Sequence, residues 1–413
     1  MTRADHLGGI FPFRSLSLRE QWWSIGFILS FLGLAFSQAL FTITLFGLSI
    51  AVVVEQLQKG APVFSRKAIG LLICPWLFVL VIPVLQCIVS STWQPLASTQ
   101  RIHLVQLPLI SLRLFFLTKK AKEILIDTAL LICCVCAVIL LIVLVNDWST
   151  VGQSIEEGKH LWVPNGHPKT TAILFVTIGI LGVNYTLGQQ KRPRFRIVST
   201  VFLLCCVHAM TVRIAWGMLY VGVAFALCRY FVKERKWKPL LIGTLALLTT
   251  PYLLYQSIPS VKKRIDYTLY DWSTFSQDGE ANTSDALRII SWDVGWKTVM
   301  KQPLLGYGGK SMDEELAKQY ALHYPAVKKE NILKPHNQFL FFALEYGLPG
   351  AFFSLVAMGC LMWFFGRSTG IVLCLVFLLY CFIDSPMYRQ MINATFWYGL
   401  GFSLMFVKET HAS

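Results

Sequence analysis

One histidine and three arginines are the side chains best placed for chemistry in this chain. His336 lies at the end of a long polar segment, residues 257–337, directly before an apolar run. An imidazole titrates near pH 6.5, so a histidine at a helix N-terminus can serve as a general base, and it can equally be a structural hydrogen-bonding group. Arg288 lies within the same segment, whereas Arg213 and Arg101 stand at the outer ends of apolar runs.

The arginines indicate an anionic ligand. A charge near bilayer depth is costly unless it faces a cavity or a partner, and no acidic partner of the three arginines is obvious nearby in the sequence. A guanidinium presents a planar fork of donors that suits bidentate binding of phosphate. The alternative for each arginine alone is that its side chain reaches out to the membrane surface.

These residues must be positioned by membrane-spanning helices. The chain has 413 residues, is 55% hydrophobic and only 14% charged, and has a mean hydropathy of +0.57. This composition excludes a soluble enzyme, a disordered chain and a disulfide scaffold. We predict an all-α polytopic membrane protein with about twelve transmembrane helices, over residues 22–38, 39–56, 68–90, 102–118, 124–146, 170–188, 196–211, 214–231, 238–256, 338–364, 368–384 and 391–407. Residues 102–118 are the weakest span, because Gln106, Pro108 and Arg113 are compatible with a partly re-entrant segment.

The basic residues predict the orientation. If the N-terminus is cytoplasmic, most lysines and arginines of the short loops fall on the cytoplasmic side, as membrane proteins prefer. All eleven cysteines lie inside predicted spans, so we expect no disulfide and no cysteine-based metal site in the loops. No cluster of histidine, cysteine and carboxylate residues has the spacing of metal ligands, and no Walker A pattern is present.

The long polar segment divides the chain into a bundle of nine spans (1–256), an extracytoplasmic loop (257–337) and three final spans (338–413). Apolar residues at helical spacing predict a helix over 285–301, which Pro303 ends. A tight turn at 306–309 follows, and Ser311 with Glu314 has the pattern of a capping box for a second helix. We expect this hairpin to lie over a membrane-facing cavity as a lid with its hinge at Pro303 and 306–309, or else to be a passive surface cap.

The polar segment and its neighbours resemble the O-antigen ligase and polymerase family. The residues that carry the resemblance are Arg288…Trp292-x-x-Gly295…Gln302-Pro303-Leu304-Leu305-Gly306-Tyr307-Gly308…His336-Asn337-x-x-Leu340…Glu345-Tyr346-Gly347-x-x-Gly350. The stretch Thr211-Val212-Arg213-Ile214-Ala215-Trp216-Gly217 is a looser match to the arginine-bearing start of a preceding span. The resemblance covers residues 196–407, and the N-terminal half agrees only in topology.

This resemblance implies a metal-independent glycosyltransferase with GT-C-like architecture and no cofactor. The donor would be O-antigen on undecaprenyl pyrophosphate, and the acceptor would be the lipid A–core of lipopolysaccharide. The enzyme would lie in the bacterial inner membrane with both termini in the cytoplasm and its active site in the periplasm. His336 would act on the acceptor hydroxyl while Arg213 and Arg288 hold the pyrophosphate. The expected substrate-binding residues are Arg101, Trp292, Tyr307, Asn337 and Glu345.

Other functions remain open on the sequence. An O-antigen polymerase would use the same donor and the same loop, and a protein-glycosylating oligosaccharyltransferase is a further option. A twelve-helix transporter or flippase is the alternative from another class, favoured by the span count and by polar residues within spans. A transporter of the major-facilitator plan would carry its longest loop between the sixth and seventh spans, whereas here that connection is short.

Overall fold

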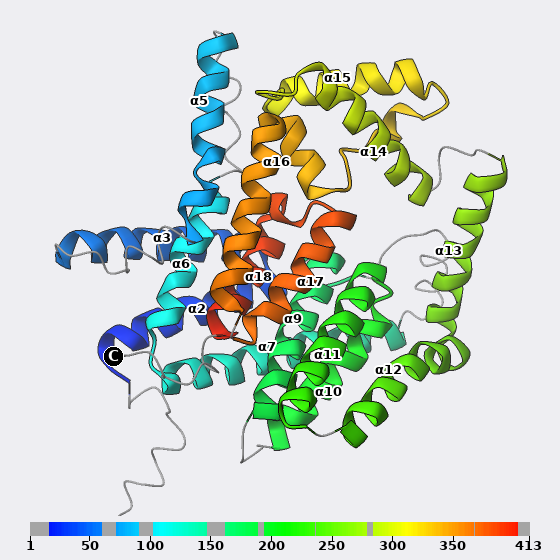
Figure 1. The fold of residues 1–413 in the computed structure, drawn as a ribbon. Helices are drawn as coiled ribbons and strands as arrows, with labels where there is room; N and C mark the ends of the chain where they lie inside the picture. Colours follow the sequence, from blue (N-terminus) through cyan, green and yellow to red (C-terminus); the bar gives the residue numbers. More distant parts are fainter. Residues whose placement is uncertain are drawn as a thin grey trace, which may run out of the picture.

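The computed structural model describes residues 16–59, 72–90, 102–146, 162–188, 194–235, 237–278, 284–366 and 368–403, and within these ranges it contains fifteen α-helices and no strand (Figure 1). In chain order the helices are α2 (Leu18–Phe36), α3 (Gln38–Lys59), α5 (Phe78–Ser90), α6 (His103–Phe116), α7 (Lys119–Asn146), α9 (Pro168–Gly188), α10 (Arg194–Ala209), α11 (Arg213–Lys233), α12 (Trp237–Ser257), α13 (Pro259–Asp278), α14 (Ser284–Lys301), α15 (Gly309–His323), α16 (Gln338–Phe365), α17 (Gly370–Ile383) and α18 (Gln390–Ser403). Single 3₁₀ turns cover Cys74–Trp76, Lys329–Asn331 and Pro386–Tyr388.

The described residues of the predicted spans are mainly helical, so the all-α prediction is confirmed, but the span predicted over 68–90 contains a 3₁₀ turn at Cys74–Trp76 and its helix α5 begins only at Phe78. Among the described residues, six helices are long and apolar enough to cross a bilayer, namely α3, α7, α9, α11, α12 and α16. Shorter apolar helices cover Cys74–Val89 and α17. Residues 103–116 form a continuous α-helix with Pro108 inside it. The full count of twelve crossings, and the side of the membrane on which each loop lies, stay predictions.

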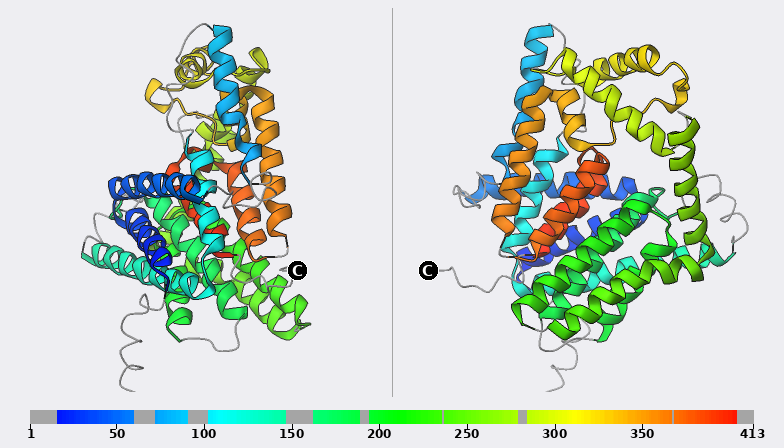
Figure 2. Two further views of the ribbon diagram at one scale, coloured as in Figure 1. Left: turned by 90° about the vertical axis from the view of Figure 1, so that its left-hand side faces the viewer. Right: turned by 45° about the vertical axis from the view of Figure 1, so that its right-hand side comes forward.

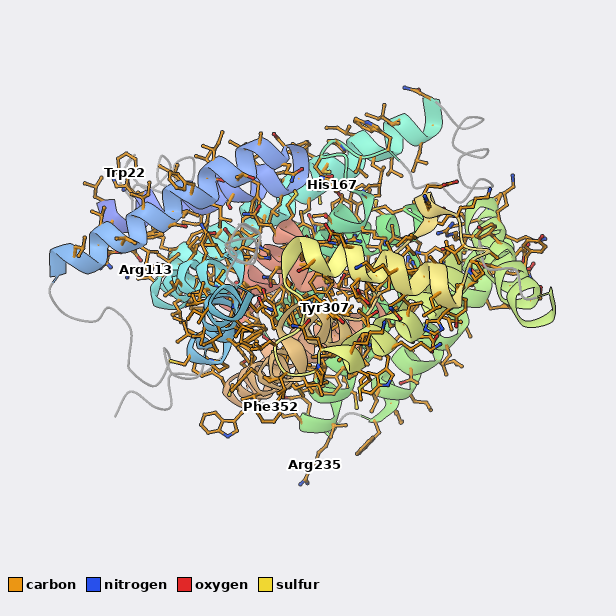
Figure 3. The ribbon with its side chains drawn as sticks, turned by 90° about the horizontal axis from the view of Figure 1, so that it is seen from above. Trp22, Arg113, His167, Arg235, Tyr307 and Phe352 are labelled. Carbon is orange, nitrogen blue, oxygen red and sulfur yellow. The ribbon has the colours of Figure 1, made fainter. Side chains whose placement is uncertain are left out.

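Apolar residues cover both the centre and the outside of the bundle. The spanning part of α9 is 83% buried, and this helix packs against α2, α7, α10, α11 and α18. The spanning part of α12 is 0% buried although it too is apolar enough to cross a bilayer. Seen from above, Trp22 and Phe352 project from the rim of the molecule (Figure 3). An apolar exterior of this kind matches hydrocarbon and does not match water.

The polar segment forms a helical layer at one end of the bundle. Figures 1 and 2 show α14 and α15 at that end, next to α5 and the beginning of α16. The hairpin predicted from the sequence is present as α14 and α15. A further helix, α13, was not predicted: it follows α12 almost directly, packs against α12 and α14, and joins the bundle to the hairpin.

A kink in α16 fastens the hairpin to the bundle. Gly347 has φ +75° and ψ 177°, and Pro349 lacks an N–H, so the carbonyls of Leu344 and Glu345 lose their helical donors. They accept instead from the N–H groups of Tyr307 (2.8 Å) and Gly308 (3.1 Å) in the hairpin turn. The amide of Gln86 on α5 also donates to the Glu345 carbonyl (2.7 Å) and to the Leu305 carbonyl (2.6 Å). Backbone groups exposed by a kink near a membrane must find such partners.

Two expectations about the hairpin need correction. The second helix begins at Gly309 with Gly308 as its N-cap, and Ser311 donates to backbone carbonyls, so the predicted capping box is wrong. The turn expected to be a hinge is pinned to α16: a Cβ on Gly306 would lie 2.5 Å from the Gly347 nitrogen. Only two glycine backbones can approach this closely, which makes the turn a fixed attachment of the hairpin.

Candidate functional site

Helix α14 carries the residues that position His336. Its face toward α16 is apolar, with Ile290 and Val294 buried. A Cβ on Gly295 would lie 2.6 Å from the Pro335 ring, so the absence of a side chain there lets the segment before α16 lie directly on α14. The N–H and the carbonyl of His336 then both reach side chains of α14.

Two side chains of α14 hold the His336 backbone. The indole N–H of Trp292 donates to the His336 carbonyl at 2.8 Å, and the hydroxyl of Ser291 accepts from the His336 N–H at 3.4 Å. The next residue, Asn337, caps α16 by accepting from two backbone N–H groups at 3.0 Å. The histidine is therefore fixed between the loop helix and the first turn of a span.

The imidazole of His336 contacts a buried carboxylate. Its Nδ1 lies 3.0 Å from Oδ1 of Asp384, which follows directly after α17 and has a side chain that is 6% exposed. The angle between the ring nitrogen and the carboxylate departs from that of a regular hydrogen bond, so the contact is an ion pair when the imidazole is protonated. Nε2 has no hydrogen-bond partner among the described residues. A carboxylate at Nδ1 and a free Nε2 are the arrangement of an oriented general base.

Asp384 stays ionised in this setting. Burial by itself raises the pKa of its carboxyl, but the interactions with His336, Lys169 and Arg389 outweigh burial and hold the pKa well below its usual range. Lys169 Nζ lies 3.4 Å and an Arg389 nitrogen 3.9 Å from Oδ2 of Asp384, and the Ser385 N–H donates to Oδ1 at 2.8 Å. A charged Asp384 favours the His336 tautomer with its proton on Nδ1.

A second carboxylate, Asp285, joins two of the predicted phosphate-binding arginines. Arg213 donates to both of its oxygens, at 2.6 and 2.8 Å, and Arg288 donates to Oδ1 at 3.1 Å. Arg213 also donates to the hydroxyl of Thr268 on α13 at 3.0 Å. The expectation that the arginines have no acidic partner nearby is therefore wrong: Asp285 stands three residues before Arg288, one helical turn away.

Helix α14 contacts both the arginine pair and His336. Asp285 lies in its first turn, and Trp292 follows Arg288 by four residues, about 6 Å along the axis. Arg288 is also close enough to repel the positive charge of Lys169, which forms an ion pair with Asp384. Around Asp285 and Asp384, the described cations outnumber the carboxylates, so this region of the structure suits an anion. The cations are Arg213, Arg264, Arg288, Lys169 and Arg389, and the carboxylates are Asp271, Asp285 and Asp384.

The remaining predicted site residues have varied surroundings. Trp292 supports His336 and is 38% exposed, which leaves part of its ring open to a substrate. Tyr307 packs in the hairpin turn and appears near the centre of the molecule from above (Figure 3). Asn337 is engaged as the cap of α16, and its amide also donates to the Phe382 carbonyl. Glu345 is buried beside the kink. Arg101 lies outside the described residues, and the substrate contacts of all five stay predictions.

Sequence reasoning missed the carboxylates. Asp285 had a local signal, because an acid three residues before an arginine on one helix is a common ion pair. Asp384 had a weaker one, as a single acid at the end of an apolar run and before Ser385-Pro386. Nothing local links Asp384 to His336, since they are brought together by the packing of α16 against α17.

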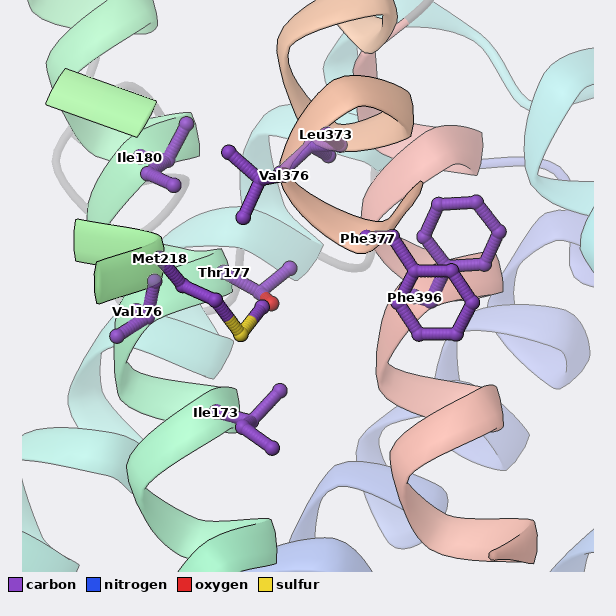
Figure 4. Close-up of a pocket in the computed structure, with 9 residues that line it drawn as sticks. All are labelled: Ile173, Val176, Thr177, Ile180, Met218, Leu373, Val376, Phe377 and Phe396. Carbon is purple, nitrogen blue, oxygen red and sulfur yellow. The ribbon is translucent and has the colours of Figure 1, made fainter. Parts of the chain in front are cut away.

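The cavity inside the bundle is not a substrate site. It lies between α9, α11, α17 and α18 and is lined by apolar side chains such as Ile173, Met218 and Phe396, with Thr177 as the polar exception (Figure 4). Its volume of about 10 Å³ is room for one water molecule. In the described part of the chain, no group of three or more histidine, cysteine or carboxylate residues could hold a metal ion; metal independence stays a prediction.

Comparison with known proteins places several residues of the site within one matched region. Residues 198–355 match the model of the protein family described as O-antigen ligase. The match begins in α10 and ends in α16, so it contains Arg213, Asp285, Arg288 and His336 but ends before Asp384. An uncharacterized protein of Haemophilus influenzae is 25% identical over 168 residues, which are 39% of this chain and 41% of that protein. The chain thus spans about two fifths of the length of this curated relative.

Proposed function

Because residues 198–355 carry the O-antigen ligase family domain, we propose that this membrane protein transfers O-antigen from undecaprenyl pyrophosphate to a sugar hydroxyl of the lipid A–core. The reaction takes place at the periplasmic face of the bacterial inner membrane. The chain crosses the membrane twelve times, with both termini in the cytoplasm. The layer formed by α13, α14 and α15 then lies in the periplasm, in a bundle of GT-C-like architecture.

The observation that supports the proposal is that an oriented base, His336, and a pair of arginines, Arg213 and Arg288, both contact helix α14. His336, with Asp384 at its Nδ1, takes the proton of the acceptor hydroxyl on Nε2. The hydroxyl oxygen attacks the anomeric carbon of the donor as the bond from that carbon to the pyrophosphate oxygen breaks. Asp384 stabilises the imidazolium that results, since it is ionised and buried beside it.

The leaving group departs with its electron pair onto the pyrophosphate. Arg213 and Arg288 stabilise the developing negative charge with donors that are already in place. Asp285 holds both guanidinium groups before the donor binds. No step requires a nucleotide, because the donor is already activated, and none requires a metal ion, because the guanidinium groups supply the positive charge.

The same site suits an O-antigen polymerase, since the matched family domain is shared by ligases and polymerases. A gel of lipopolysaccharide from a deletion strain separates the two. A core without any O-antigen, with polymer accumulating on undecaprenyl pyrophosphate, supports ligase activity. A single repeat unit on the core supports polymerase activity, and unaltered lipopolysaccharide contradicts both.

The variant His336→Ala tests the site itself. His336 lies in a connecting segment, so its replacement opens no large cavity and the purified protein should stay monodisperse. With donor and lipid A–core supplied, it should lose transfer by at least about 100-fold, the usual contribution of a general base. His323→Ala is the matched control, because His323 is an exposed histidine at the end of α15. Full activity of His336→Ala would remove this residue from the mechanism.

A further inference from the structure

One arginine of the cationic group, Arg264, has two buried guanidinium nitrogens without a hydrogen-bond partner. Arg264 lies on α13 and is only 6% exposed. Thr268 and Asp271 follow it at helical spacing on the same face, and both contact the site: Thr268 accepts from Arg213, and Asp271 accepts from the Asp285 N–H at 3.0 Å. Arg264 therefore belongs to the face of α13 that packs against the arginine pair.

The guanidinium of Arg264 is unsatisfied. Its Nε and Nη1 are buried without a hydrogen-bond partner, and no described carboxylate pairs with it. Its contact is with the ring of Tyr267, 5.7 Å away. Burial, and then the charges of Arg213 and Arg288, lower the pKa of Arg264, whereas Asp285 offsets them only in part. Burying an uncompensated charge is costly, so a site that keeps one must gain from it elsewhere.

We propose that Arg264 is a third phosphate-binding guanidinium, which contacts the pyrophosphate of the donor together with Arg213 and Arg288. The three arginines stand beside two carboxylates, Asp285 and Asp271, so positive charge is in excess, and Asp285 is fully engaged by Arg213 and Arg288. The remaining positive charge suits a diphosphate, whose phosphoryl groups are both ionised at neutral pH. This inference rests on the proposed function, because it assigns a residue to the same donor site.

The test compares two methionine variants in the full-length purified protein. Arg264→Met removes the buried charge and keeps an unbranched apolar side chain, and Lys262→Met removes an exposed charge two residues earlier on the same helix. The probe is inorganic pyrophosphate, with affinity measured by calorimetry and the melting temperature measured with and without the probe. Arg264→Lys is a second variant, which keeps the charge and loses the fork.

We expect Arg264→Met to melt at or above the temperature of the wild type without pyrophosphate, because it relieves a buried unpaired charge. Its affinity for pyrophosphate should fall about tenfold or more, as expected for the loss of a charge-assisted hydrogen bond. Arg264→Lys should restore only part of the affinity, and Lys262→Met should match the wild type.

Three results would overturn the inference, and they differ in what they imply for the proposed function. If the wild type binds pyrophosphate and Arg264→Met binds it equally well, Arg264 is not a ligand-binding residue, and the proposed function stands. A lower melting temperature of Arg264→Met with unchanged affinity would assign it a structural role. If the wild type itself does not bind pyrophosphate, the donor chemistry of the proposed function fails together with this inference.

Discussion

Replacing Asp384 by asparagine removes one charge from the site while keeping the size of the side chain. In the wild type its carboxylate lies 3.0 Å from His336 Nδ1, 3.4 Å from Lys169 Nζ and 2.8 Å from the Ser385 nitrogen. An asparagine retains one acceptor oxygen for the Ser385 N–H, but it cannot balance Lys169 or stabilise a protonated His336. The effect on turnover should therefore exceed the effect on folding.

The magnitudes follow from burial and charge. Breaking a fully buried ion pair costs about 3–5 kcal/mol, but the side chains of Lys169 and Arg389 are 18% and 40% exposed and regain water. We therefore expect Asp384→Asn to lose about 2 kcal/mol of unfolding free energy. Turnover should fall about 100-fold or more, because the base loses its orienting group and its counter-charge.

The pH dependence of stability has a defined sign. Burial raises the pKa of Asp384, but His336, Lys169 and Arg389 together hold it well below its usual range in the folded protein. A carboxyl with a depressed folded pKa stabilises the protein above its unfolded pKa of about 3.9, and this contribution is lost as the pH falls towards the folded value. The stability difference between wild type and Asp384→Asn should therefore shrink as the pH falls below about 4.

The assay is transfer with purified donor and lipid A–core, alongside denaturation of the same preparations. Asp313→Asn is the control, because Asp313 forms an exposed pair with Lys334 at 2.9 Å and such pairs contribute little. An active Asp384→Asn, or a loss of activity no larger than the loss of folded protein, would refute the role of Asp384 in orienting His336.

Three further outcomes are expected. Arg213→Lys and Arg288→Lys should each retain the charge but lose the fork, so transfer should fall about tenfold or more; efficient rescue by lysine at both positions would instead indicate side chains that only reach the membrane surface. Transfer in excess EDTA should equal the untreated rate, and loss that one added metal restores would contradict the proposed mechanism. Gly306→Ala should cost about 2 kcal/mol or more, because φ is +66° and the Gly347 backbone is in the way, and limited proteolysis should then cut the α14–α15 hairpin faster.

Several features could be predicted from the sequence because local patterns determine them. The apolar runs placed most of the described helices within a few residues, since the length of a run and its flanking polar residues decide where a helix begins and ends; the exception is 68–90, where α5 begins only at Phe78. The hairpin followed from helical spacing, Pro303 and the glycine turn. The helix α13 was missed because its mean hydropathy is low and two of its buried residues, Arg264 and Asp271, are polar. A polar buried face has no periodic apolar signature.

Only the tertiary structure decided how the site is assembled. His336 and Asp384 are separated by the whole of α16 and α17, and Lys169 comes from α9 in the first half of the chain. The kink at Gly347 fastens the hairpin to the bundle through hydrogen bonds between backbones distant in sequence. Such contacts depend on which helices pack together, and the spacing of residues along the chain does not predict this packing. The sequence by itself therefore determined the histidine, the arginines and the helices that bear them, whereas packing alone determined which carboxylate each of them meets.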